Sequence, residues 1–122
     1  MSEKYKILLV DDDDIIAALE EEVLKSYGYI VDRASNGLEA VGKLEFNTYN
    51  LIVSDYLMPQ MNGEQFYKYL QEKHPEMLSK FIIVSGSISD TNFFVSKGVV
   101  VLNKPFNIKE FAQTVNDVIT KS

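Results

Sequence analysis

Cysteine is missing from this sequence of 122 residues, and its absence excludes both disulfide bonds and metal sites built from thiolates. No apolar run approaches the ~18 residues that a membrane-spanning helix needs, so a membrane protein is not expected. The first four residues, Met1-Ser2-Glu3-Lys4, lack the apolar segment of a secretory signal peptide. These absences together predict a cytoplasmic protein.

Positive charge is also scarce. The 12 lysines and arginines are outnumbered by 18 acidic residues, which gives a formal net charge of −6. Direct binding to a nucleic-acid backbone needs clustered basic residues, so that function class is not expected. The hydrophobic fraction of 46% and the length are those of one ordinary globular domain, which we expect to occupy residues 1–122.

Apolar runs typical of strands alternate with segments of helical periodicity. We expect strands at residues 5–10, 29–34, 51–54, 81–84 and 99–102. Helices are expected at residues 14–27, 38–47, 64–74 and 90–97, and a last helix begins near Ile108. Five strands alternating with five helices predict an α/β fold, a doubly wound parallel sheet with helices on both faces.

The first expected helix has a recognisable start, stripe and end. Asp14 is the expected N-cap, and Gly28 is expected to end the helix. Ile16, Leu19 and Val23 recur at helical spacing, which predicts that they face the core.

Polar groups follow the apolar strands. Asp11 and Asp12 follow the first strand, Asp55 the third, Ser85 the fourth and Lys104 the fifth. The carboxyl ends of parallel strands share one edge of a sheet, where α/β proteins bind their ligands. Two carboxylates held ~4 Å apart repel by about 4 kcal/mol at an effective dielectric constant of roughly 20. A hard cation such as Mg²⁺ would remove that repulsion, which predicts a cation site.

The Ser85 hydroxyl and the Lys104 ammonium group predict that the same site also binds a phosphoryl group. Ser85 and Lys104 suit phosphoryl oxygens next to the ion, and a carboxylate there can act as a nucleophile toward phosphorus.

The chain resembles the receiver domains of two-component response regulators, such as the chemotaxis regulators. The resemblance covers essentially the whole chain, and it rests on the motifs Val10-Asp11-Asp12, Asp55-Tyr56-Leu57-Met58-Pro59-Gln60-Met61-Asn62-Gly63, Val84-Ser85-Gly86 and Lys104-Pro105-Phe106. It implies a flavodoxin-like five-stranded sheet with the strand order 2-1-3-4-5.

The resemblance also implies a role for each matched site residue. Asp55 is the implied phosphoacceptor, Ser85 hydrogen-bonds the phosphoryl group, and Lys104 pairs with it. The implied ligands of Mg²⁺, for which Mn²⁺ is a possible substitute, are Asp11, Asp12, Asp55 and the backbone carbonyl of Leu57.

Further positions concern turnover and switching. Pro105 is expected to set the backbone that aims Lys104, in many family members through a cis bond. Leu57 and Ser87 occupy positions that tune hydrolysis of the acyl phosphate, and the apolar Leu57 predicts slow autodephosphorylation. Val101 stands where the family usually has an aromatic switch residue, so we do not expect an aromatic switch. The stretch between Ser85 and Lys104 is short for the family, which predicts a short or irregular fourth helix.

The expected function is therefore a phosphoacceptor switch, not an enzyme, that promotes its own phosphorylation and dephosphorylation. Its expected partners are a histidine kinase or a histidine phosphotransfer protein, and an output protein or a phosphorylation-dependent homodimer.

Two alternatives remain open at this point. One is a Mg²⁺-dependent phosphohydrolase whose aspartyl nucleophile follows the first strand, with Asp11 and Asp13 as the pair. The other is a degenerate receiver that only binds partners.

Overall fold

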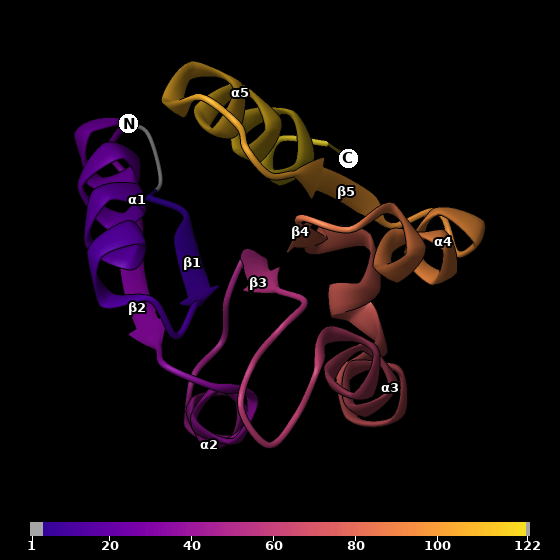
Figure 1. The fold of residues 1–122 in the computed structure, drawn as a ribbon. Helices are drawn as coiled ribbons and strands as arrows, with labels where there is room; N and C mark the ends of the chain where they lie inside the picture. Colours follow the sequence, from indigo (N-terminus) through magenta and orange to yellow (C-terminus); the bar gives the residue numbers. More distant parts are fainter. Residues whose placement is uncertain (1–3, 122) are drawn as a thin grey trace.

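The computed structural model describes residues 4–121, and its centre is a five-stranded parallel sheet (Figure 1). The strands lie in the order β2-β1-β3-β4-β5, as the resemblance predicts. Their bounds are β1 Lys6–Val10, β2 Ile30–Ala34, β3 Leu51–Asp55, β4 Phe81–Ser85 and β5 Val100–Asn103. Each strand thus lies within one or two residues of its predicted position.

Pairing in the sheet aligns the strands that carry the polar ends. Val10, the last residue of β1, pairs with Ser54, so Asp11 and Asp55 follow at neighbouring positions on adjacent strands. Ser85, at the end of β4, pairs with Asn103 of β5, directly before Lys104. The register therefore collects the expected site residues at one edge.

Helices cover both faces of the sheet, and each face has its own core (Figure 1). Helices α1 and α5 pack on one face, and α2, α3 and α4 pack on the other. The bounds are α1 Asp14–Ser26, α2 Gly37–Phe46, α3 Gly63–Lys73, α4 Ile88–Ser96 and α5 Ile108–Ile119. A 3-10 helix at Pro75–Lys80, which the sequence reasoning missed, links α3 to β4. None of the helices within the described part of the chain has the length and apolar character needed to span a bilayer.

The prediction for α1 was wrong in two respects. Its N-cap is Asp13 rather than Asp14, because Asp13 Oδ1 accepts the backbone N–H groups of Ile15 and Ile16, each at 3.0 Å. The inward face is also different. Ile16 is 37% exposed and Leu19 47% exposed, Val23 is half-buried, and the buried residues are Ala17, Glu20 and Leu24.

Two other predictions about helices are confirmed. Gly28 follows α1 with a φ of 92°, in the left-handed region that glycine adopts easily. The fourth helix, α4, is short, with nine residues, and it is a regular α-helix rather than an irregular one.

Candidate functional site

Three carboxylates meet at the carboxyl edge of the sheet, where β1 and β3 end. One ligand atom from each of Asp11, Asp12 and Asp55 lies within 4.8 Å of the others. Asp11 is 2% exposed and Asp55 is 6% exposed, whereas Asp12 is open to solvent. The group is thus buried on one side and accessible on the other, which suits a hydrated hard cation.

Lys104 and Ser85 complete the same edge. Lys104 Nζ lies 3.2 Å from Asp55 Oδ1, and the Lys104 backbone N–H donates to the Ser85 carbonyl at 2.8 Å. Asp55, Leu57, Ser85 and Lys104 all line a cavity of ≈200 Å³. The structure therefore brings the predicted phosphoacceptor Asp55, the Ser85 hydroxyl and the Lys104 ammonium group to one cavity. The peptide bond between Lys104 and Pro105 is cis.

The electrostatics of the cluster follow from burial and like charge. Burial and the neighbouring Asp11 raise the pKa of Asp55 to about 8, although Lys104 opposes the shift. Burial lowers the pKa of Lys104, but Asp55, Asp11 and Glu20 together more than offset that effect, and the net shift is upward. Lys104 alone thus does not offset the cost of ionising Asp55 beside Asp11, and a further cation there would stabilise the ionised form.

The loop that carries Asp11 is held from the neighbouring strand β2. The Arg33 guanidinium donates to the backbone carbonyl of Asp11 at 2.8 Å and lies 2.7 Å from Asp14 Oδ1. The backbone N–H of Asp11 donates to Ala34 at 3.0 Å, and that of Asp13 donates to Asp11 Oδ1 at 2.9 Å. These contacts fix the direction of the Asp11 side chain.

Comparison with known proteins identifies this arrangement. The sequence matches the model of the response regulator receiver domain over residues 7–116. The chain belongs to this family. Its receiver fold and its four sequence motifs agree with that assignment.

The chain is similar to receiver-containing proteins of different lengths. The chain is 34% identical over 126 residues to the sensor kinase CckA of Brucella abortus. The match covers 99% of this chain but only 13% of that kinase. A crystal structure of a putative response regulator from Chloroflexus aurantiacus is 29% identical, with a TM-score of 0.87, and the match covers 98% of this chain and 100% of that one.

A third relative was solved with its ion. The receiver domain of the sensor histidine kinase PA1611 of Pseudomonas aeruginosa has a magnesium ion coordinated in its active site cleft. It is 23% identical to this receiver with a TM-score of 0.85, and the match covers 98% of this chain and 100% of that one. At that identity the likeness demonstrates the shared fold.

Of the expected tuning and switch residues, Leu57 lines the receiver's cavity. The Leu57 side chain is 73% exposed, and Ser87 donates its backbone N–H to Ser85 Oγ at 3.1 Å. Val101 is half-buried against the core that contains Tyr56 and Phe94. The rings of Tyr56 and Phe94 meet edge to face with centroids 6.0 Å apart, so an aromatic contact links the residue after Asp55 to α4.

Sequence reasoning missed two residues of this receiver site, Arg33 and Glu20. Nothing in the sequence around Arg33 signals its contact with Asp11, since the two residues lie 22 positions apart and meet only because β2 pairs with β1. Glu20 lies at helical spacing from Ala17 and Leu24, which is a signal, but the apolar Ile16 and Leu19 favoured another face. Burial, Asp11 and Asp55 raise the pKa of Glu20 to about 8.

Proposed function

We propose that this receiver is a phosphoacceptor switch in which Asp55 takes a phosphoryl group from the phosphohistidine of a sensor kinase or a phosphotransfer protein. The observation that carries the proposal is the surroundings of Asp55. It is a buried carboxylate with an ammonium group at 3.2 Å and two further carboxylates within 4.8 Å, and it lines a small cavity.

The residues divide the chemistry between them. A carboxylate oxygen of Asp55 attacks the phosphorus atom, a P–O bond forms, the P–N bond to the donor imidazole breaks, and the imidazole leaves with a proton from solvent. Lys104 pairs with the incoming oxygens, and the Ser85 hydroxyl donates a hydrogen bond to them. Hydrolysis of the resulting acyl phosphate returns Asp55 to its starting state.

The site requires a divalent cation in this proposal. Asp11, Asp12, Asp55 and the backbone carbonyl of Leu57 would hold Mg²⁺, because the donor set consists of oxygens and is only partly neutralised by Lys104. The bound ion would neutralise negative charge on the transferring phosphoryl group.

Phosphorylation of Asp55 would then change which partner this receiver binds, an output protein or a second copy of the chain. The module is a switch that promotes its own phosphorylation and dephosphorylation, so we do not class it as an enzyme.

The test uses acetyl phosphate and MgCl₂, with intact-protein mass spectrometry as the measurement. The wild-type protein is expected to gain one phosphate-sized mass, and Asp55→Asn and an EDTA-treated sample are expected to gain none. Asp11→Asn is expected to slow the gain but keep the modification on Asp55.

The same experiment separates the alternatives. Labelling that survives in Asp55→Asn and disappears in Asp11→Asn would support the phosphohydrolase alternative, in which Asp11 is the nucleophile. No mass gain in the wild-type protein would support a receiver that only binds partners.

A further inference from the structure

Arg33 is a basic residue of β2 whose side chain is held against the acidic run after β1. That side chain is only 23% exposed, although arginine usually lies at the protein surface. Within the part of the chain that the structure describes, Arg33 Nε is buried without a hydrogen-bond partner. An unpartnered buried N–H group is unfavourable, so the other contacts of the guanidinium must favour arginine at this position.

The guanidinium reaches two points of the acidic run. Arg33 Nη2 donates to the backbone carbonyl of Asp11 at 2.8 Å and lies 2.7 Å from Asp14 Oδ1. The Asp14 side chain is 84% exposed, so solvent screens this ion pair and it contributes little to stability. The contact with Asp11 is part-buried, and it joins two strands that are paired in the sheet, where Leu9 lies opposite Arg33. The backbone of Asp11 is therefore the point that Arg33 holds most firmly.

The four consecutive aspartates after β1 have separate roles in the structure. Asp13 is the N-cap of α1, and Asp14 pairs with Arg33. Asp11 and Asp12 belong to the group of three acids that would hold the cation. One oxygen of the Asp11 carboxylate also accepts the Asp13 backbone N–H at 2.9 Å. The direction of the Asp11 carboxylate thus depends on how the backbone of this run is held.

We propose that Arg33 is a positioning residue of the cation site, which holds the backbone of Asp11 so that the Asp11 carboxylate stays beside Asp55. The inference rests on the proposed function, because the cation site is the one assigned there. Groups that support a metal ligand from behind commonly govern metal affinity, since they fix the orientation of the ligand. Arg33 acts through Asp11 and does not itself contact the cation or the phosphoryl group.

Charge and position have opposite effects at Arg33, and this separates the two explanations. A positive charge beside a cation site repels the cation, so loss of the Arg33 charge alone should tighten cation binding. Loss of the hydrogen bond to the Asp11 carbonyl should weaken binding, because the carboxylate can then turn away from Asp55. Weaker binding by a folded variant that lacks the charge therefore indicates lost positioning.

The experiment is a titration with Mn²⁺, in which electron paramagnetic resonance reports the free ion directly. Mn²⁺ suits carboxylate and carbonyl ligands as Mg²⁺ does. Arg33→Met has an uncharged, unbranched side chain without N–H donors, and it is expected to bind Mn²⁺ about 10-fold more weakly than the wild-type protein. Circular dichroism at the assay temperature shows whether the variant is folded, and Arg33→Gln takes its place with the same expectation if it is not.

Asp14→Asn is the control for the ion pair. It removes the exposed charged partner of Arg33 but leaves the contact of Arg33 with the Asp11 carbonyl. Its Mn²⁺ affinity is expected to stay within about twofold of the wild-type value, because solvent and salt screen the lost charge.

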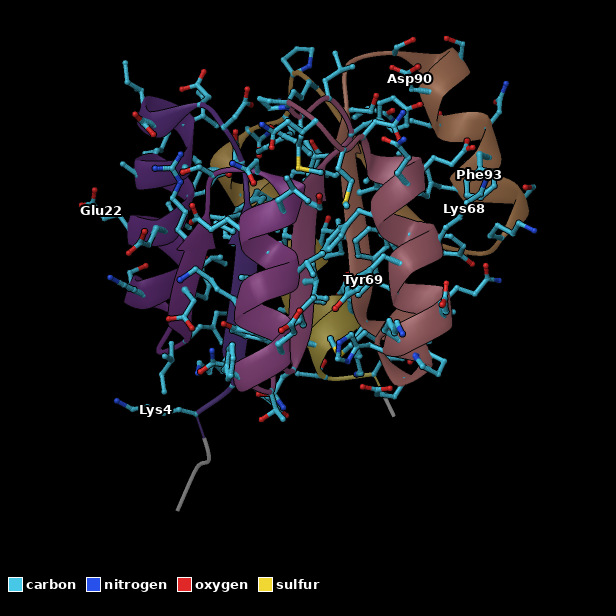
Figure 2. The ribbon with its side chains drawn as sticks, turned by 90° about the horizontal axis from the view of Figure 1, so that it is seen from below. Lys4, Glu22, Lys68, Tyr69, Asp90 and Phe93 are labelled. Atoms are coloured by element: carbon cyan, nitrogen blue, oxygen red, sulfur yellow. The ribbon has the colours of Figure 1, made fainter. Side chains whose placement is uncertain are left out.

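Lys4→Met is the control for overall charge, since it removes one positive charge as Arg33→Met does. Lys4 is exposed and precedes β1, whereas the acidic run follows that strand, and its side chain points away from the fold (Figure 2). Its Mn²⁺ affinity is also expected to stay within about twofold of the wild-type value.

Phosphorylation by acetyl phosphate provides a second measurement. An effect on cation affinity predicts that Arg33→Met is phosphorylated more slowly than the wild-type protein at limiting Mg²⁺. At saturating Mg²⁺ the two rates should approach each other, because the lost affinity is then compensated by concentration. A rate for folded Arg33→Met that stays low at every Mg²⁺ concentration would contradict the proposed role.

Three results of the Mn²⁺ titration would overturn the inference. Folded Arg33→Met could bind Mn²⁺ as tightly as the wild-type protein or more tightly, which would leave the cation site intact but remove Arg33 from it. Asp14→Asn or Lys4→Met could weaken binding as much as Arg33→Met, which would remove the specific role of the contact with Asp11. A wild-type protein that does not bind Mn²⁺ would overturn the proposed cation site and this inference with it.

Discussion

Gly63 provides a steric test of how the backbone after Asp55 is held. A Cβ atom at this position would lie 2.7 Å from Ile83 Cδ1 and 3.0 Å from Tyr56 Cα. Ile83 is fully buried in β4, and Tyr56 Cα is part of the backbone, so neither atom can move away freely. The Gly63 backbone N–H also donates to the Tyr56 carbonyl at 2.7 Å. Gly63→Ala must therefore push α3 and the loop before it away from the residue that follows Asp55.

The expected magnitude combines two opposing effects. Overpacking of this kind typically destabilises a protein by about 1–3 kcal/mol. Replacing glycine by alanine restricts the unfolded chain and recovers about 0.4–1 kcal/mol. The net loss is expected to be about 1–2 kcal/mol, which lowers the melting temperature of a protein of this size by roughly 3–8 °C. Displacement of Tyr56 should also weaken cation binding, since Asp55 and Leu57 flank it.

Gly42→Ala is the control for this measurement. Gly42 lies in α2, is exposed, and has nothing within 4 Å of an added Cβ atom, so alanine should stabilise the helix by about 0.5–1 kcal/mol. Thermal unfolding followed by circular dichroism in EDTA compares both variants with the wild-type protein. A Gly63→Ala variant that melts at or above the wild-type temperature would refute the steric argument.

Two further predictions concern the charge of the site and the lifetime of its product. The pKa values of Asp55 and Glu20 are raised to about 8 in the folded protein, so the folded state holds protons that the unfolded state has already released between about pH 4.5 and 8. Stability of the metal-free protein should fall as pH rises through that window, by about 1–3 kcal/mol between pH 6 and 8, and 10 mM Mg²⁺ should reduce the loss. Urea unfolding at both pH values, with EDTA or Mg²⁺, measures this, and equal stability at pH 6 and 8 in EDTA would contradict it. Leu57→Asn should shorten the lifetime of phosphorylated Asp55 by about tenfold, because the amide can orient the attacking water while Leu57→Ala cannot. A phosphate-release time course decides the point, and a wild-type half-life of seconds would count against slow hydrolysis.

Much of the site could be predicted because it depends on chain order rather than on distance. Asp11 and Lys104 follow directly on β1 and β5, and Asp55 and Ser85 are the last residues of β3 and β4. Once the strands are parallel, their carboxyl ends must share an edge, so these side chains converge whatever the details of packing. The structure adds the distances, the burial and the ion pair of Lys104 with Asp55.

The prediction for α1 failed for a physical reason. Ile16, Leu19 and Val23 form the more apolar stripe, and hydrophobic periodicity alone turns that stripe inward. The structure instead buries Glu20 and leaves Leu19 exposed. Periodicity weighs each residue by its own hydrophobicity and does not include the neighbours that a polar side chain finds in three dimensions.

The amino-acid sequence by itself determined the alternation of strands and helices and the identity of the groups at the strand ends, because both are properties of contiguous residues. Only the tertiary structure decided which face of α1 is buried. It also decided that Arg33 of β2 binds the backbone of Asp11 and that the Gly63 N–H donates to the Tyr56 carbonyl. Those features arise between segments far apart in the chain, where packing space and the balance of buried charge, rather than local pattern, select the arrangement.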